Sequence, residues 1–560
     1  MRVTQNIHHR GTTSWSSRDL AHVTAWLVAT LLFINTLYFV WRAASPVLHD
    51  DAWYFLDVFL GKAIHGDLGL ADFFVKRPNL DHAQPLYKLL WLLEWRYFDL
   101  DLSIGAIAGV LAATASALVF HRVLLAQWQG DRGDILRYLT WAGICALLFS
   151  LNADAGEWTW PLVAFSNVTN LIVLLFFLAV WRAHQRQRHG LLALATLFLG
   201  ISSDDSALIA VIAAVLALLL MQFADPVQRQ RSTWKVLCVI ALCTILVRIG
   251  YAWAPVVGAA SPVSMTSQLG SLFERLLDHG WWKWAVLPLT LPVFYRSAFP
   301  FVPADAFGVL QVILGILLLA AHAWFWWKAL RSRYNRPAFV AVCLMLFFYG
   351  SLAGIILGRV STGGNDYLEQ PRYIVFYAGH LIALLLMWAG GHHPALPSNP
   401  SDRTAGRRMR LWLGVTGCVA LLIGQIPPSI HAWRMQPYLE AAYATLAARI
   451  NRLALDPEHM TDCLPGMTVC DWVPARRRRL TQLLSRSQLN VFSPQVQRRH
   501  SYLPRLSPVP AEPALPHHGS PGNGSGHPGV SLPARGSLPP APAADVSPVQ
   551  STAAGAPGGR

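Results

Sequence analysis

Two adjacent carboxylates stand where the first long apolar run of the chain ends. Asp50 and Asp51 follow His49 in the stretch "SPVLHDDAWYFLDVF", directly after the apolar residues 25–41. Aspartate is ionised at neutral pH, and as a general base it typically accelerates a reaction by about 10²–10⁴. The alternative is structural, with Asp51 capping a helix that begins at Ala52 and Asp50 merely solvated. The spacing alone is compatible with both interpretations.

Other charged residues recur between later apolar runs. The stretches "LNADAGEWTWP", "SSDDS" and "GRVSTGGNDYLEQPRY" contribute Asp154, Glu157, Asp204, Asp205, Glu369, Arg359 and Arg372. Guanidinium groups suit phosphate because they offer paired hydrogen-bond donors. Arg248 lies near the end of its own apolar run, where a charge is expected to face a cavity. The structural alternatives are polar hairpin tips for the acids and interfacial anchoring for the arginines.

The sequence contains no pattern typical of a bound cofactor. It has neither a dinucleotide fingerprint nor a phosphate-cradling glycine loop. His49 and His82 are isolated histidines that we interpret as structural or site-lining, so we expect no metal site. A divalent ion bound by carboxylates is the alternative that the sequence leaves open.

Composition places the chain in the membrane class. Of its 560 residues, 54% are hydrophobic and 13% are charged, whereas soluble domains carry about 25% charged residues. Apolar runs of roughly 20 residues recur, the length needed to cross a bilayer core of about 30 Å. The formal net charge of +15 suggests a nucleic-acid partner, but the basic residues lie in short clusters between apolar runs, where membrane topology explains them. We therefore predict an all-α polytopic bundle in a lipid bilayer and exclude nucleic acid.

Eleven apolar spans are expected. They lie near residues 22–41, 102–120, 138–151, 162–181, 191–203, 207–222, 235–253, 306–327, 337–358, 373–390 and 411–426. Basic residues outnumber acidic ones in the six segments that would lie inside, the N-terminus included, and acidic ones prevail in the five outside before the tail. This pattern predicts a cytoplasmic N-terminus (1–21) and an extracytoplasmic C-terminus. "RRRR" at 476–479 then lies outside, in a long tail that the rule governs weakly.

The connecting segments define the remaining organisation. Within the transmembrane domain, 22–426, the first outer loop (42–101) is expected to hold amphipathic helices at about 52–64 and 85–98, lying along the membrane surface. The loop 254–304 contains a second interfacial stretch. The segment 427–502 is expected to carry a helix over Tyr438–Leu455, and the Pro/Gly/Ala-rich tail 503–560 is predicted to be disordered. Cys463 and Cys470 would form a disulfide if that segment is extracytoplasmic.

Three segments carry a resemblance to a known superfamily. "DHAQPLYKLLWLLEWRYF" (81–98), "GRVSTGGNDYLEQPRYIVFYAGHL" (358–381) and "LTQLLSRSQLNVFSP" (480–494) resemble segments of bacterial membrane proteins of the GT-C superfamily, the polyprenyl-phosphate-dependent glycosyltransferases. The resemblance implies that a first-loop acid is the catalytic base, with Asp51 preferred over Asp50. It also implies that Arg359 and Arg372 bind the donor phosphate, to which we add Arg248. His49, the Asp81–His82 step and the acids of the later loops would line the site.

The activity that this resemblance implies is the transfer of a sugar from a polyprenyl-phosphate donor. The acceptor would be a periplasmic envelope glycan, lipid or protein, and the enzyme would lie in the bacterial inner membrane with its C-terminus in the periplasm. A single base with direct displacement implies inversion at the sugar. The sequence departs from the superfamily pattern at "QPRY", where a serine usually precedes the arginine. The alternatives are a transporter or flippase for a lipid-linked glycan, which should show repeated halves and broken helices, and a noncatalytic relative in envelope assembly.

Overall fold

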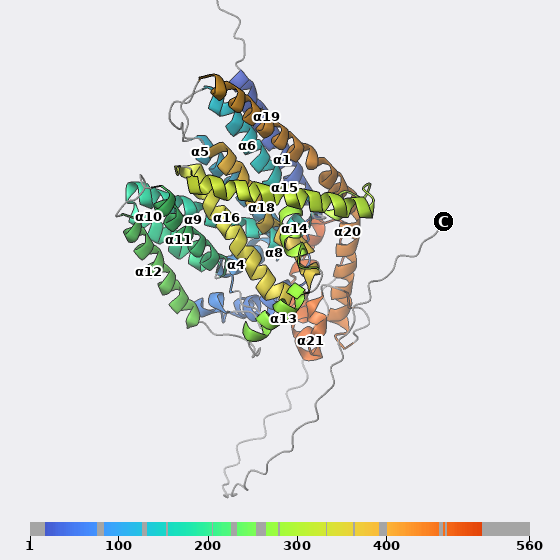
Figure 1. Ribbon diagram of the computed structural model, residues 1–560. Helices are drawn as coiled ribbons and strands as arrows, with labels where there is room; N and C mark the ends of the chain where they lie inside the picture. Colours follow the sequence, from blue (N-terminus) through green and yellow to red (C-terminus); the bar gives the residue numbers. More distant parts are fainter. Residues whose placement is uncertain are drawn as a thin grey trace, which may run out of the picture. The chain divides into compact units, whose positions relative to one another are not determined.

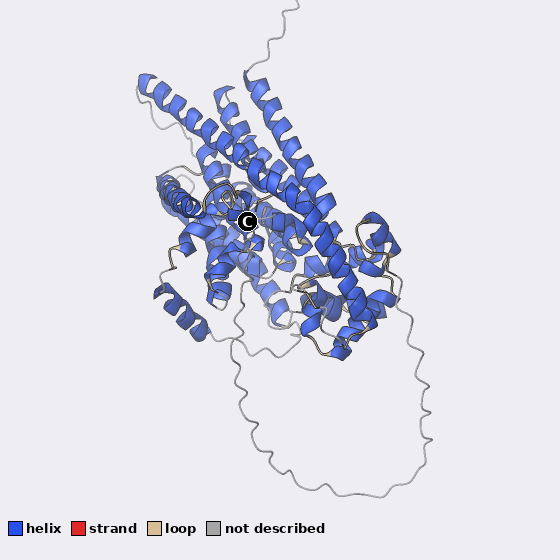
Figure 2. Cartoon of the chain, turned by 90° about the vertical axis from the view of Figure 1, so that its right-hand side faces the viewer, coloured by secondary structure: helices blue, strands red, loops and turns tan. Residues whose placement is uncertain are grey.

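The computed structural model describes residues 17–75, 83–125, 131–152, 155–203, 205–225, 232–253, 265–277, 280–331, 333–361, 364–390, 400–458, 463–464 and 467–506. All of them belong to one compact unit, Met1–Val509. Every regular element within these ranges is a helix, which confirms the predicted all-α class (Figure 2). In this part of the chain nine helical stretches are long and apolar enough to cross a membrane, and Ile135–Leu148 and His189–Ser202 are shorter apolar helices.

Each of the expected spans coincides with a helix. These helices are α1 (Ser17–Ala43), α5 (Ser103–Leu125), α6 (Asp131–Leu148), α9 (Ser166–Arg186), α10 (His189–Ser202), α11 (Asp205–Ala224), α12 (Ser232–Ala252), α15 (Ala304–Arg331), α16 (Arg336–Ile355), α18 (Pro371–Gly390) and α19 (Pro400–Gly424). A helix satisfies its backbone hydrogen bonds internally, as a bilayer requires. Large apolar side chains such as Leu194, Ile245 and Ile316 are exposed on these helices. Such a surface indicates a lipid environment.

Small residues allow the helices of the bundle to approach one another. α16 packs along α18, α11 packs along α16, and α10 lies between α9 and α12 (Figure 1). A Cβ atom on Gly109 would collide with the backbone carbonyl of Ala164, and one on Gly200 would lie 2.8 Å from a methyl group of Val247. Glycine at these contacts lets the backbones pack closely, as is usual between helices in membranes.

The stretch predicted to be interfacial around residue 285 is buried instead. α14 (Lys283–Thr290) buries Val286, Leu287 and Leu289 within the bundle. His380 of α18 donates a hydrogen bond to the carbonyl of Leu289 at 3.1 Å, and the Asn152 amide donates one to the carbonyl of Leu291. Non-spanning backbone is tolerated at such a place when its polar groups find partners inside the protein. The prediction of an interfacial stretch is therefore contradicted for residues 286–291, whereas Trp281 and Trp282 at its start are exposed.

The first loop and the C-terminal segment share a second hydrophobic core. The loop contributes α2 (Ala52–Phe55), η1 (Leu56–Leu60), α3 (Gly61–His65), η2 (Leu70–Phe74) and α4 (Pro85–Phe98). The C-terminal segment contributes α20 (Ile426–Leu455), η8 (Thr468–Asp471), α21 (Pro474–Arg486), η9 (Asn490–Phe492) and α22 (Pro494–Arg499). Trp53, Phe55 and Trp91 pack there with Leu484 and Phe492. We call this combined unit the lobe.

The first amphipathic helix was expected along the membrane surface, but it lies inside the lobe. Trp53, Phe55 and Phe59 are fully buried, so the apolar face of residues 52–65 packs against protein rather than lying along lipid. α4 is different, because Leu89, Leu93 and Tyr97 are exposed on the side opposite its buried Trp91. α4 therefore keeps an apolar strip of the kind that a membrane surface would cover.

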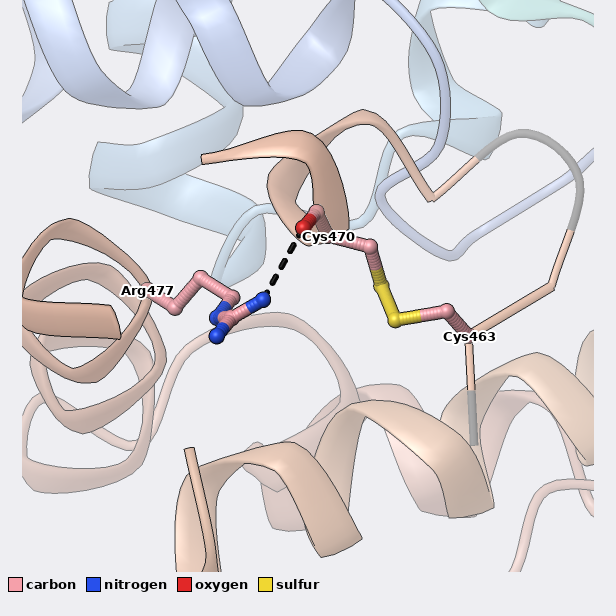
Figure 3. Close-up of a disulfide and its surroundings, with 3 residues drawn as sticks. All are labelled: Cys463, Cys470 and Arg477. Atoms are coloured by element: carbon pink, nitrogen blue, oxygen red, sulfur yellow. Dashed lines mark hydrogen bonds between the residues drawn. A yellow bond between two sulfur atoms is a disulfide. The ribbon is translucent and has the colours of Figure 1, made fainter. Parts of the chain in front are cut away.

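The run of four arginines is used inside the lobe. Arg476 and Arg479 both donate to the carboxylate of Asp57 in the first loop. Arg477 is buried and donates to the carbonyl of Cys470 at 2.9 Å (Figure 3), and Arg478 pairs with Glu458. Because these charges are engaged in folding, their position does not have to follow the charge rule for membrane topology.

A disulfide closes the loop that supports these arginines. Cys463 and Cys470 are bonded to one another (Figure 3). The carbonyl of Cys470 is the acceptor for Arg477, whose neighbour Arg476 holds Asp57. The link between the disulfide loop and the first loop therefore passes through two adjacent arginines.

The helix expected at Tyr438–Leu455 begins earlier than predicted. α20 starts at Ile426 and continues through Pro437 to Leu455. Pro427 and Pro428 fall in its first turn, where the missing amide donors cost nothing. α19 ends one residue before the cap of α20, so the expected domain boundary at 426/427 lies at a helix start.

Candidate functional site

One cavity of about 290 Å³ lies between the bundle and the first loop. It is lined by Asp51, Gln84, Tyr87, Trp160, Leu162, Val163, Phe165, Ser166, Thr169, Ser202, Ser203, Asp205, Ser206, Ile209, Ser351, Gly354, Ile355, Arg359, Arg372, Tyr373 and Phe376. These residues come from the turn before α2, from α4, α8 (Pro161–Ala164) and α9, from the end of α10 and the start of α11, and from α16, η6 (Ile356–Val360) and α18, together with residues next to these helices. The cavity is thus built from segments far apart in the sequence.

Four of the residues predicted from the sequence meet at this cavity. Asp51, Asp205, Arg359 and Arg372 all line it, each from a different part of the chain. Two carboxylates and two guanidinium groups balance one another in formal charge. Such a set can hold an anionic group and also accept a proton from a hydroxyl.

The two adjacent acids occupy different environments. Asp51 lines the cavity and precedes α2, all of whose residues are described, yet its side chain makes no capping hydrogen bond to that helix. Asp50 has a left-handed backbone, with φ of 47°, and its carboxylate is 2.8 Å from Nδ1 of His49. It does not line the cavity. The left-handed residue turns the chain so that only the second acid faces the site.

Both cavity arginines stand where a helix is interrupted or begins. Arg359 lies in η6, a π-helical turn that continues α16, and such turns are frequent at functional sites. Arg372 is the second residue of α18, with its guanidinium 5.1 Å from the ring centre of Tyr373. Its buried Nε atom has no hydrogen-bond partner among the described residues. A phosphate oxygen would supply the missing acceptor.

Aromatic and hydroxyl side chains complete the cavity wall. Tyr87, Trp160, Phe165, Tyr373 and Phe376 provide the apolar surface, whereas Ser166, Thr169, Ser202, Ser203, Ser206 and Ser351 provide hydroxyl groups. None of these side chains was predicted from the sequence to line a site, and the serines of "SSDDS" were noted only beside the two acids. The available signal was the presence of small polar residues inside otherwise apolar spans. A ligand with both hydroxyl groups and apolar parts would fit such a wall.

Three other predicted residues lie away from the cavity lining. Glu157, in α7 (Gly156–Thr159), accepts a hydrogen bond from Asn167 at 2.9 Å. Burial raises the pKa of Glu157 to about 7, so this carboxyl group titrates near neutrality. Glu369, at the end of η7 (Asn365–Glu369), is exposed. Arg248 lies on α12 and is not part of the cavity wall.

The remaining predicted residues fall in two groups. His49 lies beside the main cavity, with its ring 5.7 Å from that of Trp160. Asp81, His82, Asp154 and Asp204 lie outside the described residues. Within the described ranges no group of three histidine, cysteine, aspartate or glutamate side chains is placed to hold a metal ion.

A buried pair of acids that the sequence did not suggest lies in the lobe. Glu94 is 1% exposed, and burial together with the nearby Asp101 raises its pKa well above the usual range. Burial also raises the pKa of Asp101, but hydrogen bonds from His500, Ser103 and Arg499 outweigh it and lower that pKa overall. Asp101 is therefore the charged member of the pair, and it ties α22 to the start of α5.

No protein-family model matches this chain, and no curated protein is significantly similar to it. The described residues form an α-helical protein with several helices long and apolar enough to span a membrane, and a lobe formed by the first loop and the C-terminal segment. The function is therefore inferred from the contents of the cavity.

Proposed function

We propose that this protein is an integral membrane glycosyltransferase of GT-C type. It transfers a sugar from a polyprenyl-phosphate donor to a cell-envelope glycan, lipid or protein. The observation that supports this proposal is the cavity in which Asp51 and Asp205 meet Arg359 and Arg372. Its aromatic wall lies at the ends of apolar helices, where a lipid-linked substrate would arrive from the bilayer.

The proposed reaction assigns one role to each kind of side chain. Asp51 takes the proton of the acceptor hydroxyl as the acceptor oxygen bonds to the anomeric carbon. The bond between that carbon and the phosphate oxygen breaks, and polyprenyl phosphate leaves with the electron pair. Arg359 and Arg372 hold the phosphate and stabilise its developing charge. Direct displacement without a covalent intermediate inverts the configuration at the sugar.

The proposed topology has eleven spans in a bacterial inner membrane. The first loop and the C-terminal segment share the lobe core, so both belong on one side of the membrane. Ten of the expected spans separate them, and an even number returns the chain to the same side. The disulfide suits an oxidising compartment. These features support a cytoplasmic N-terminus and a periplasmic lobe.

Cysteine labelling tests this topology. In a Cys238→Ser background, which removes the exposed free cysteine, we expect His65→Cys and Ser487→Cys to react with a membrane-impermeant maleimide in spheroplasts. Arg188→Cys, between α9 and α10, should react only after lysis. Labelling of the first two positions from opposite sides would contradict the lobe's placement, and labelling of all three from outside would contradict the span count.

Reconstitution tests the proposed activity. Purified protein in vesicles is given a radiolabelled polyprenyl-phosphate sugar and an extract of envelope acceptors, and the label is followed into polar products and across the bilayer. A transferase moves the label into acceptor material and releases unlabelled polyprenyl phosphate. Movement of intact labelled donor between leaflets, with the sugar–phosphate bond preserved, would instead identify a flippase and exclude the transferase.

A further inference from the structure

Three arginines come together at the ends of α9 and α16 that are remote from the cavity. Arg182 and Arg186 are four residues apart in the last turns of α9, so they share one face of that helix. Arg336 is the first residue of α16. The rings of Trp181 and Phe339, 5.4 Å apart, hold these two helix ends against each other. The guanidinium of Arg336 is consequently repelled by those of Arg182 and Arg186.

The described residues supply no acid to offset this repulsion. None of the three guanidinium groups forms an ion pair within the described ranges, and the buried Nε atom of Arg336 has no hydrogen-bond partner there. The nearby carboxylate of Asp225 is buried and accepts a hydrogen bond from the amide of Tyr334 at 2.9 Å. Like charges at close range disfavour the fold. An anion bound between them would remove that cost.

The surface next to these arginines is apolar and faces outward. Leu171, Leu175 and Leu178 lie 11, 7 and 4 residues before Arg182, a spacing that places them on its face of α9. Leu175 is 46% exposed, and Trp234 at the start of α12 is 70% exposed. The contact between Thr233 and His184 holds that end of α12 beside α9. A partly exposed stripe of leucines therefore leads up to the guanidinium groups, with Leu175 exposed and Leu171 and Leu178 half-buried.

We propose that Arg182, Arg186 and Arg336 bind the phosphate headgroup of an anionic phospholipid whose acyl chains lie along the leucine stripe of α9. The stripe distinguishes a lipid from free phosphate, which would contact the arginines alone. Basic pockets between the ends of membrane helices are typical sites for phospholipid headgroups that carry more than one negative charge. This site is separate from the cavity, because Ser166 and Thr169 line the cavity at the other end of α9, about 20 Å away at 1.5 Å per residue.

Native mass spectrometry tests this proposal without requiring any enzymatic activity. The full-length protein is delipidated in detergent and titrated separately with cardiolipin, phosphatidylglycerol, phosphatidylcholine and inorganic phosphate. Each arginine near a membrane surface contributes about fivefold to the binding of an anionic lipid. We therefore expect Arg182→Gln/Arg336→Gln to weaken cardiolipin binding about 25-fold. Arg333→Gln, an exposed arginine just before α16, should bind as the wild type does.

Two further comparisons distinguish loss of the lipid site from other causes of weak binding. The triple arginine-to-lysine variant preserves charge and should retain most of the binding, which shows that loss in the glutamine variants does not arise from misfolding. Phosphatidylcholine should bind at least tenfold more weakly than cardiolipin. Equal binding of both lipids, unchanged cardiolipin binding by the double glutamine variant, or full displacement of cardiolipin by millimolar inorganic phosphate would each overturn the proposal.

Discussion

Replacing Asp51 with asparagine is expected to lower the rate of sugar transfer by about 10²–10⁴, the usual contribution of a general base. Asparagine is nearly the same size as aspartate, so donor binding by the cavity should change little. The measurement is the initial rate of label transfer from radiolabelled polyprenyl-phosphate sugar by protein in vesicles, together with the dissociation constant of the donor. A large loss of rate with unchanged binding indicates a group that acts in the transition state.

Asp50→Asn is the matched control for this experiment. Asparagine tolerates the left-handed backbone at this position, where φ is 47°, so the turn that presents Asp51 should persist. The contact between His49 and the Asp50 carboxylate lies outside the cavity lining. We expect the transfer rate of Asp50→Asn to stay within about threefold of the wild type, well below the effect of losing a base.

Asp205 supplies the competing assignment, because it is the second carboxylate in the cavity. Asp205→Asn should raise the KM for the acceptor more than it lowers kcat if Asp205 only positions the acceptor. A loss of 10² or more in kcat for Asp205→Asn, with near-normal transfer by Asp51→Asn, would move the catalytic role to Asp205. Full transfer by both variants would exclude a carboxylate base in this cavity.

The helices at the expected spans were predictable because their signal is local. A run of about 20 apolar residues forms a helix wherever the backbone must satisfy its own hydrogen bonds, and each expected span matches a helix. α14 is the exception. Its eight residues are too few to span a membrane, and their burial depends on partners distant in the chain, such as His380. Composition could not distinguish a short apolar helix on the membrane surface from one inside the bundle.

The individual helices of the lobe were predictable, but their association was not. Both loop helices were expected at nearly their observed bounds, but their shared core joins residues near 50 and 90 to residues beyond 440. Lys88 illustrates the difficulty, since the sequence suggests an exposed lysine on an amphipathic helix. Its ammonium group is instead buried and donates to the carbonyls of Asp72, Phe73 and Val75. These partners lie 13 to 16 residues from Lys88, so even pairing within the first loop left no signal in the sequence. The contacts with residues beyond 440 are far more distant along the chain.

The cavity shows the same division between local and non-local information. Residue type and position at span ends were enough to select Asp51, Asp205, Arg359 and Arg372, which meet at one cavity. The choice between Asp50 and Asp51 depended on a backbone angle that the sequence does not encode visibly. Arg248 and Glu369 satisfied the same sequence criteria but do not line the cavity, because the packing of α12 and η7 sets the direction in which each side chain points.

Asn490 is expected to be the most sensitive structural residue of the lobe. Its side chain donates to the carbonyls of Pro46 and Leu100, both at 2.7 Å, and accepts from the amide of Leu48 at 3.2 Å. It is fully buried and has φ of 55°. Asn490→Ala leaves these buried backbone groups unpaired, which should cost about 3–5 kcal/mol in the opening free energy of the lobe. Hydrogen exchange of peptides covering residues 46–56 and 480–496 should accelerate by about 10²–10⁴.

Gln488→Ala provides the matched control, because Gln488 also has a positive φ, of 50°, but its side chain is exposed. We expect Gln488→Ala to cost well under about 1 kcal/mol, because glutamine and alanine both carry a Cβ atom and bear the same left-handed strain. Asn490→Gly removes the three hydrogen bonds while keeping the backbone unstrained, so its cost should stay close to that of Asn490→Ala. If the amide hydrogens of the Asn490→Gly variant exchange at the wild-type rate, then the backbone angle rather than the hydrogen bonds makes Asn490 important. With the hydrogen bonds lost, the segment that ends at Leu48 is released three residues before Asp51, and transfer should fall with lobe stability.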